Sequence, residues 1–133
     1  MKKHGLKWYK DKLWDLVSKY VRLKYANEQG MVQCYTCLKW FHWKKIQCGH
    51  GFSGRGNAIL FLEEILRPQC YADNCLNSGK LDIFTYKLRE ELGITRFEEL
   101  WALKHTQRTF TIDELETMIE IYKQKIKEIK CVI

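Results

Sequence analysis

Proline and glycine are scarce in this chain of 133 residues, which holds one proline and 8 glycines. This scarcity leaves little room for flexible linkers, which are rich in such residues. Turn-forming residues gather in the middle of the chain, at 48–57 and 67–80. We therefore predict a single domain with one hydrophobic core, and we expect a functional site in the middle loops.

Long apolar runs are missing too. No stretch reaches the run of about 18 apolar residues that a membrane-spanning helix needs. The charged first 25 residues also lack the apolar core of a signal peptide. We expect no membrane partner and predict a cytoplasmic protein, in the host cell cytoplasm if a phage encodes it. Six cysteines in such a reducing compartment indicate metal ligands or buried thiols before disulfides.

Acidic residues are in deficit, because 23 Lys and Arg stand against 16 Asp and Glu, a net charge of +7. In residues 1–25, eight basic residues face two acidic ones. A cationic surface attracts DNA phosphates whatever the base sequence, although a run of charge alone fits an ordinary solvated helix face equally well. The candidate DNA-contacting residues are Lys3, Lys7, Lys10, Arg22, Lys24, Lys44, Lys45, Arg55 and Arg67.

The first half of the chain predicts one helix and a small β-rich region. Apolar residues recur at spacings of three and four over roughly residues 5–26, which is typical of an amphipathic helix. Residues 31–36 and 43–48 are predicted to be two short strands, joined by a knuckle that begins at Cys37. The apolar run 58–66 fits a strand or a helix, and its periodicity does not decide between them.

The second half predicts three helices. The first runs from Ser78 to Leu92 and ends at Gly93, a residue type that favours helix ends. Capping boxes at 95–98 and 111–114 are each followed by a helical pattern, so they predict the starts of two more helices. The last helix, about residues 112–130, carries lysines near its end and forms a second basic patch.

The cysteines predict a zinc site. Cys34 and Cys37 form a C-x2-C knuckle, and Cys70 and Cys75 follow later in the chain. Two such pairs can close a tetrahedral thiolate site around Zn²⁺. The alternative is that some are plain buried cysteines, and Cys48 is a substitute ligand.

The loop after the second strand holds candidates for catalysis. His50 stands beside glycines, where we expect it to be exposed and able to take a proton from water at neutral pH. Arg55 can grip a phosphate oxygen, and the amides of Asn74 and Asn77 can bind a hard Mg²⁺ ion. Each has a structural alternative as a packing histidine, a surface arginine or a turn asparagine. His42 is either a second active-site group or a surface residue, and the sequence does not decide between them.

The combined pattern of residues 14–50, 52–57, 67–74 and 78–79, with the closing segment 111–128, resembles the NinG/Rap family of phage recombination endonucleases. The likeness covers about residues 8–125. It implies an α+β fold with a ββα-metal core of HNH, treble-clef-like type and a structural zinc. The single domain 1–133 then consists of a basic N-terminal helix (1–30), a zinc-stapled core (31–92) and a helical extension (93–133).

The resemblance also implies a function, namely hydrolysis of phosphodiester bonds in branched DNA such as D-loops and Holliday junctions, with Mg²⁺ or Mn²⁺. By the same resemblance, His50 is the general base, Asn74 holds the catalytic metal, and Cys34, Cys37 and Cys70 bind zinc. Branched DNA has two-fold character, so a homodimer is an open possibility.

Other residues complete the expected active site. Gln47, His42 and Asn77 are candidate additional ligands of the catalytic metal, alongside Asn74. Arg55 would add positive charge at the scissile phosphate.

Three departures from the family pattern qualify the prediction. The position of the fourth zinc cysteine falls on Asp73, while Cys75 lies two residues later, and we favour Cys75. Ile65 stands where the HNH pattern has its middle asparagine, and Gly49 supplies no carboxylate before the histidine. These departures favour the rival hypothesis of a zinc-ribbon DNA-binding protein without catalysis. A zinc-stabilised adaptor is a third hypothesis, but it leaves the +7 charge unexplained.

Overall fold

Helices and two small antiparallel sheets make up the fold, as the α+β prediction requires. The computed structural model describes residues 4–132, and side chains as far as residue 129. None of the helices in that range combines the length and apolar character needed to cross a membrane.

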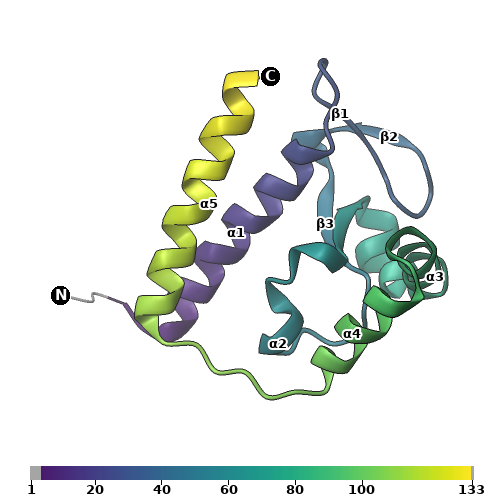
Figure 1. The fold of residues 1–133 in the computed structure, drawn as a ribbon. Coiled ribbons are helices and arrows are strands. Elements are labelled where there is room, and N and C mark those ends of the chain that lie inside the picture. The colour runs from purple at the N-terminus through teal and green to yellow at the C-terminus, as the bar shows by residue number, and fades with distance from the viewer. Residues whose placement is uncertain (1–3, 133) are drawn as a thin grey trace.

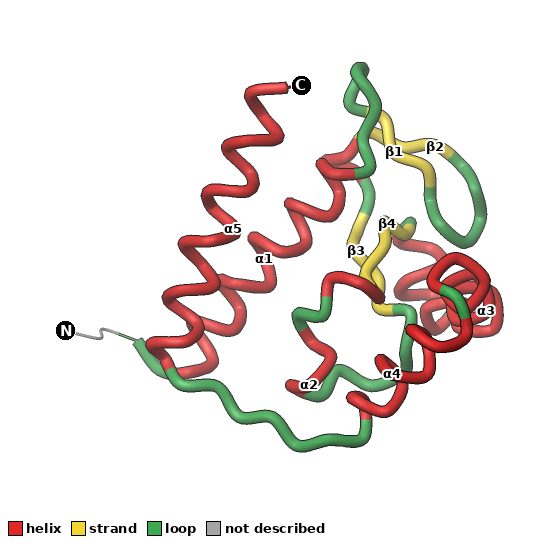
Figure 2. Tube along the Cα trace, in the orientation of Figure 1, coloured by secondary structure: helices red, strands yellow, loops and turns green. Residues whose placement is uncertain are grey.

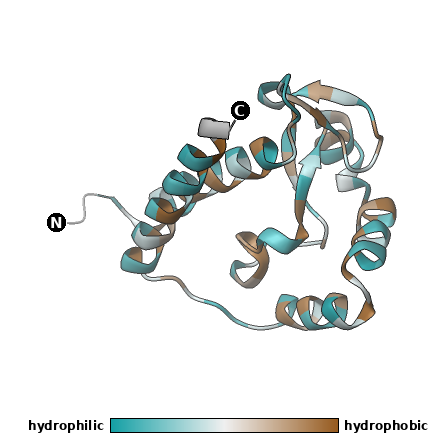
Figure 3. Ribbon diagram, turned by 45° about the horizontal axis from the view of Figure 1, so that its top comes forward, coloured by the Kyte–Doolittle hydropathy of each residue, from teal (hydrophilic) through white to brown (hydrophobic). Residues whose placement is uncertain are grey.

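Two long helices, α1 (Leu6–Lys24) and α5 (Ile112–Val132), lie side by side and run in the same direction (Figure 1). The predicted first helix is confirmed, and its apolar stripe is buried at Leu13, Val17 and Val21. Figure 3 shows hydrophobic and hydrophilic residues alternating around the helices. Burial of these stripes supplies most of what holds the two helices together.

The sheets pair differently from the prediction (Figure 2). β1 (Met31–Gln33) pairs with β2 (Trp40–His42), and β3 (Gln47–His50) pairs with β4 (Leu66–Gln69), both antiparallel. The predicted strands 31–36 and 43–48 are therefore wrong in their bounds, because the first ends at Gln33, residues 43–45 form a 3-10 turn, and only 47–48 of the second belong to a strand. The knuckle reverses at Leu38, whose φ of 68° is left-handed, so the chain returns to β1 earlier than expected.

The ambiguous run 58–66 divides into three parts. It begins in the short helix α2 (Asn57–Leu60), continues through the 3-10 turn η2 (Glu63–Ile65) and ends where β4 begins. Ile65 is fully buried. The residue at the middle HNH position therefore serves packing and offers no polar group.

Short turns lead from β4 into the remaining helices. They are η3, a π-helical turn (Ala72–Leu76), and η4 (Ser78–Lys80), followed by α3 (Leu81–Leu92) and α4 (Ile94–Lys104). Gly93 ends α3 at φ 84° as predicted, but α4 starts at once, so Thr95 lies inside the helix and the first predicted capping box does not form. The second box forms, because Thr111 and Glu114 bond each other's backbone N–H, both at 3.1 Å.

Two clusters of buried side chains hold the structure together. The larger joins α1 and β3 to α3, α4 and α5, with Leu88, Leu100 and Leu115 fully buried. The smaller lies under the knuckle and consists of Val32, Cys34, Ile46 and Cys70. Two of its four members are cysteines, so this part of the fold has little apolar surface to stabilise it without a further bond.

Candidate functional site

Four potential metal ligands meet beneath the knuckle. The Sγ atoms of Cys34, Cys37 and Cys70 and a carboxylate oxygen of Asp73 all lie within 4.8 Å of one another. The Sγ atoms of Cys37 and Cys70 are 3.8 Å apart. Three sulfurs and one oxygen at this spacing can surround a tetrahedral ion such as Zn²⁺.

The environment of Asp73 fits a bound cation. Its side chain is 6% exposed, and it accepts hydrogen bonds from the Thr36 hydroxyl at 2.6 Å and from Asn77 Nδ2 at 3.3 Å. No Lys or Arg of residues 4–129 forms a salt bridge with it. A buried carboxylate without a cationic partner is costly, and a metal ion among the thiols would balance its charge.

Hydrogen bonds also prepare one thiol for metal binding. Burial alone would raise the pKa of Cys34, but hydrogen bonds from Thr36 and from the backbone N–H groups of Cys37 and Cys70 outweigh it and lower the pKa to about 7. Burial and the two neighbouring thiols raise the pKa of Cys70 to about 11. Because the thiolate is the ligand, Cys34 is the sulfur most readily available to a metal.

The fourth predicted ligand, Cys75, lies outside this cluster. Its side chain is exposed, and its Sγ donates to Gln47 Oε1 at 3.3 Å. The Asp73 carboxylate lies with the three thiols, whereas Cys75 lies near the end of the π-helical turn η3 and its Sγ contacts Gln47 on the side of β3. The preference for Cys75 over Asp73 is therefore corrected. Cys48 is buried in the main core, which raises its pKa to about 12, and it does not join the cluster.

A cleft of about 430 Å³ opens beside the metal cluster, between α1, β3 and η3. It gathers three of the predicted catalytic residues, Gln47, Arg55 and Asn74, and adds Arg22. Two arginines line it and no carboxylate does. Such a cleft attracts an anion, and its two guanidinium groups suit phosphate oxygens.

His50 lies next to this cleft, held on two sides. Its ring stacks on Trp14 with centroids 4.9 Å apart and planes 16° apart, and its Nε2 is 3.0 Å from the Leu60 carbonyl oxygen. Because a carbonyl only accepts, Nε2 carries the proton and Nδ1 is left as the acceptor. The ring is half-buried, which corrects the expectation that His50 is exposed.

The same surroundings keep His50 neutral. Burial is the main cause that lowers its pKa to about 4; the hydrogen bond to Leu60 opposes this shift, and the positive charge of Arg55 adds to it. At neutral pH the imidazole is therefore in its basic form.

Two side-chain amides face each other in the cleft. Asn74 Nδ2 donates to Gln47 Oε1 at 2.7 Å, and Asn74 directly follows the cluster residue Asp73. The knuckle metal would thus fix the position of Asn74. A hard divalent cation can use amide oxygens, but these are neutral donors, so such an ion would take the rest of its ligands from water and a bound phosphate.

Two predicted ligands lie elsewhere. His42 Nδ1 accepts from the Lys44 backbone N–H at 3.2 Å and caps the 3-10 turn η1 (Trp43–Lys45). Asn77 bonds Asp73, on the side of the thiol cluster. Neither lines the cleft, so the structure does not bring them to Asn74 as the catalytic-metal prediction proposed.

Several predicted DNA-contacting residues extend the cleft along α1. Lys7 and Lys10 share a second hollow of about 510 Å³ with Trp14, Arg55 and one acid, Asp11, which pairs with Lys7 at 2.7 Å. At the other end, Arg22 donates to the Trp43 carbonyl at 3.0 Å and lies over the Trp43 ring. Lys44 also lies 5.6 Å from that ring centroid. Together they form a cationic track with aromatic surfaces along one side of α1.

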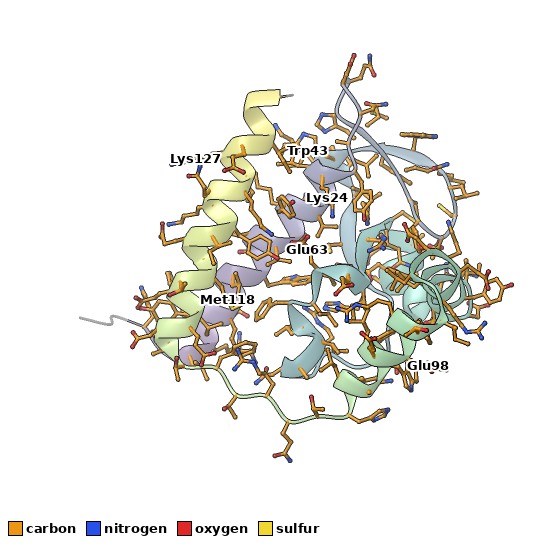
Figure 4. All side chains as sticks on the ribbon, viewed as in Figure 1. Lys24, Trp43, Glu63, Glu98, Met118 and Lys127 are labelled. Atoms are coloured by element: carbon orange, nitrogen blue, oxygen red, sulfur yellow. The ribbon has the colours of Figure 1, made fainter. Side chains whose placement is uncertain are left out.

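Other members of the predicted DNA-contacting set do not belong to this track. Arg67 is 5% exposed and pairs with Glu91 at 2.9 Å, so it is structural and no phosphate contact. Lys24 lies 3.7 Å from Glu63, and Figure 4 labels both. Lys45 is exposed, and Lys3 lies outside the described residues.

Trp14 was not predicted as a site residue, although the spacing of its neighbours on α1 indicates it. Lys10, Trp14, Ser18 and Arg22 follow one another at steps of four, and residues so spaced share a helix face. Lys10 lines the adjoining hollow, and the other three line the cleft. An aromatic residue between two cations on one face was therefore visible as a candidate DNA-contacting group.

Comparison with protein families finds a match over residues 1–131 to the model described as bacteriophage lambda NinG protein. Comparison with curated proteins and with solved structures finds no match. The family match spans the knuckle, the cleft and both long helices.

Proposed function

Because the chain belongs to the bacteriophage lambda NinG family, a membership that indicates a phage recombination-related protein, we propose that it is a metal-dependent DNA endonuclease of the HNH type. Its substrates in this proposal are branched recombination intermediates such as D-loops and Holliday junctions. The observation that carries the proposal is a neutral histidine, with Nδ1 free to accept, beside a two-arginine cleft.

The order of elements supports the HNH type. Two paired strands, β3 and β4, lead into η3 and α3, which parallels the strand–strand–helix order of a ββα-metal core. His50 ends the first strand, and Asn74 lies on the first turn after the second. These are the positions that the resemblance assigns to the base and to a metal ligand.

The missing carboxylate before His50 has a structural cause. A Cβ atom at Gly49 would lie 2.3 Å from Gln69 Oε1 and 3.1 Å from the Phe84 ring. No side chain fits there without moving the core. A ligand from β3 must therefore come from another residue of the strand, and Gln47 is the residue of β3 that bonds Asn74.

Hydrolysis in this site begins at His50. Its Nδ1 accepts a proton from water as the water oxygen bonds to phosphorus and the bond to the 3′ oxygen breaks. Arg55 and Arg22 bind the phosphate oxygens and offset the charge that develops on them. Trp14 and the Leu60 carbonyl hold the imidazole in one orientation, so the side chain does not have to change rotamer before the proton is transferred.

Asn74, with Gln47, would hold the divalent ion. When bound there, Mg²⁺ or Mn²⁺ supplies charge stabilisation for the phosphate and the leaving oxygen. The protein supplies no carboxylate to the cleft, so ion and DNA should bind together, each weakly without the other.

The substrate lies along α1 in this proposal. Lys7, Lys10 and Lys44 extend the positive charge beyond both arginines, and contacts of this kind read the DNA backbone more than its sequence. The protein would then select its DNA by shape, which is the property that distinguishes a branch from a linear duplex.

The proposal is tested by incubating the purified protein with a four-way junction and with linear duplex, in Mg²⁺, Mn²⁺ or chelator. We expect metal-dependent cutting of the junction. His50→Ala should lower the cutting rate by about 100-fold or more, as loss of a general base does, while junction binding persists. His105→Ala is the matched control, because His105 is an exposed histidine at the C-terminal end of α4 and lines neither the cleft nor the adjoining hollow.

Equal cutting by His50→Ala and wild type would remove the assignment of the base. Junction binding without cutting in any metal would instead support the rival, a zinc-stabilised DNA-binding protein without catalysis.

A further inference from the structure

A second pocket, of about 310 Å³, lies on the knuckle between the end of α1, the β1–β2 hairpin and α3. It is separate from the cleft and has no residue in common with it. Cys34 lines this pocket, while Asn74, next to Asp73, lines the cleft. One candidate metal ligand therefore borders the knuckle pocket, and the sequence neighbour of another borders the cleft.

Three aromatic side chains form the walls of this knuckle pocket. They are Tyr25, Tyr35 and Trp40. Trp40 is 54% exposed, and it contributes little to the core, since it belongs to neither buried cluster. An exposed tryptophan beside a pocket marks a binding surface more often than a folding requirement.

The backbone is held in an unfavourable conformation to present Trp40. Leu38 has a φ of 68°, a left-handed backbone conformation that costs free energy for a bulky side chain. The side chain is also 54% exposed, so burial of leucine does not offset this cost. The backbone bond from Leu38 N–H to the Cys34 carbonyl, 3.0 Å, and that from Cys34 N–H to the Lys39 carbonyl, 2.8 Å, hold the turn. Strain of this kind collects at functional positions, because the surrounding structure must sustain it.

The charge in the pocket selects the kind of ligand. Lys87 Nζ lies 4.2 Å from the Tyr35 ring centroid, and Arg67 lies 5.7 Å from that of Tyr25. Among the described residues, Glu91 is the acid that faces them, bonded to Arg67 and to the Tyr35 hydroxyl. Aromatic walls alone also suit organic cations, but Lys87 repels these, whereas the charge of Arg67 is paired with Glu91. A planar group that carries negative charge fits both features.

We propose that the knuckle pocket binds an unpaired nucleotide of DNA, with its base stacked on Trp40 and its phosphate at Lys87. Base stacking on aromatic side chains with a neighbouring cation is how single strands are held without sequence preference. The inference rests on the proposed function for its substrate, since a D-loop contains a displaced single strand where a linear duplex does not. The pocket would let the protein recognise that displaced strand.

The test measures binding without cleavage, so it does not depend on the nuclease proposal. Full-length, metal-loaded protein is titrated into labelled oligothymidylate and into linear duplex, in buffer without Mg²⁺ or Mn²⁺. Trp40→Ala should weaken oligothymidylate binding by about 10-fold or more, because a stacked base contributes about that much, and leave duplex binding unchanged. Trp40→Phe, which keeps a ring, should retain most of the affinity.

Trp8→Ala is the matched control. Trp8 is 45% exposed on α1 and outside the knuckle pocket, so its loss should change neither affinity. Lys87→Gln should lower the salt dependence of oligothymidylate binding by about one counterion.

Three outcomes would overturn the proposal. The first is unchanged oligothymidylate binding by both Trp40→Ala and Lys87→Gln. The second is an equal loss on single strand and duplex. The third is dTMP binding as tightly as the oligonucleotide, because the pocket would then serve a free nucleotide. If junction cutting fails while the single-strand effect of Trp40→Ala persists, the endonuclease proposal falls and the knuckle pocket stands.

Discussion

The contacts of His50 distinguish it from the other described histidines. Its ring lies against Trp14, its Nε2 is fixed by Leu60, and burial keeps it neutral. His42 and His105 have no such enclosure, and their surroundings are a turn and an exposed helix end. A histidine whose pKa is lowered by folding contributes to the pH dependence of stability, whatever its part in chemistry.

The pH dependence of stability follows from the lowered pKa of His50. Its pKa falls from 6.5 to about 4 in the folded protein, so the unfolded chain takes up the proton first. The contribution to stability is complete above pH 6.5 and is lost as pH falls toward 4, by up to about 3 kcal/mol. Denaturant unfolding at several pH values measures it.

His50→Gln isolates this contribution from that of the acidic residues. The variant should lose less stability than wild type between pH 6.5 and pH 4. Parallel curves for the two proteins would show that His50 keeps an ordinary pKa in the folded state.

At the scale of elements, Glu63 links three of them. From η2, its Oε1 accepts from the Tyr122 hydroxyl at 2.6 Å and from Lys125 Nζ at 3.2 Å, both on α5. Its Oε2 lies 3.7 Å from Lys24 Nζ at the end of α1. Burial by itself would raise the pKa of Glu63, but these three partners lower it. The carboxylate thus joins the α1–α5 pair to the central region.

Removing the Glu63 carboxylate should destabilise the protein. Glu63→Ala leaves the partly buried Tyr122 hydroxyl without its acceptor and two lysines without their counter-charge. We expect a loss of about 1–3 kcal/mol in the free energy of unfolding. Glu99→Ala removes an exposed ion pair with Arg96 and should change it by about 0.5 kcal/mol or less. Equal losses of unfolding free energy in the two variants would mean that the Glu63 contacts stabilise the fold no more than a surface ion pair does.

Helices were predictable from the sequence and strand pairing was not. The stripe of α1 and the reciprocal cap at Thr111 and Glu114 are local, so spacing alone reveals them. The pairing of β1 with β2 depends on a left-handed turn at Leu38, a conformation that leucine does not favour. The predicted capping box at Thr95 does not form, because α4 begins directly after Gly93 and Thr95 is already inside the helix.

The site was predictable in its residues more than in its geometry. His50, Arg55, Gln47 and Asn74 were all named from the sequence, and the structure places them in or beside one cleft. The choice between Asp73 and Cys75 depended on the helical turn after Cys70, which the sequence analysis did not assign.

At the scale of the whole molecule, the two buried clusters differ in what they depend on. The larger includes residues from α1, α3, α4 and α5, whereas the smaller has four buried members, two of them metal-ligand candidates, with partly buried side chains such as Phe41 and Trp43 packed against it. A metal bound by these ligands would contribute a large share of the order under the knuckle. The large cluster contains none of the four candidate ligands.

Removing the metal should therefore loosen one part of the molecule and spare the rest. After chelation, backbone amides of the β1–β2 hairpin and η3 should exchange hydrogen about 10-fold faster or more, while those of α1 and α5 stay protected and the helical circular dichroism changes little. Hydrogen exchange read residue by residue measures both. Cooperative loss of all helices on chelation would contradict this division.

The parallel pairing of α1 with α5 also governs the order of events on the ribosome. The ribosome makes α1 before β1–β4, α3 and α4, and α5, which covers α1, follows all of these. Until α5 is made, the stripe of Leu13, Val17 and Val21 lacks its final cover. The α1–α5 contact therefore forms only after every element between the two helices has left the exit tunnel.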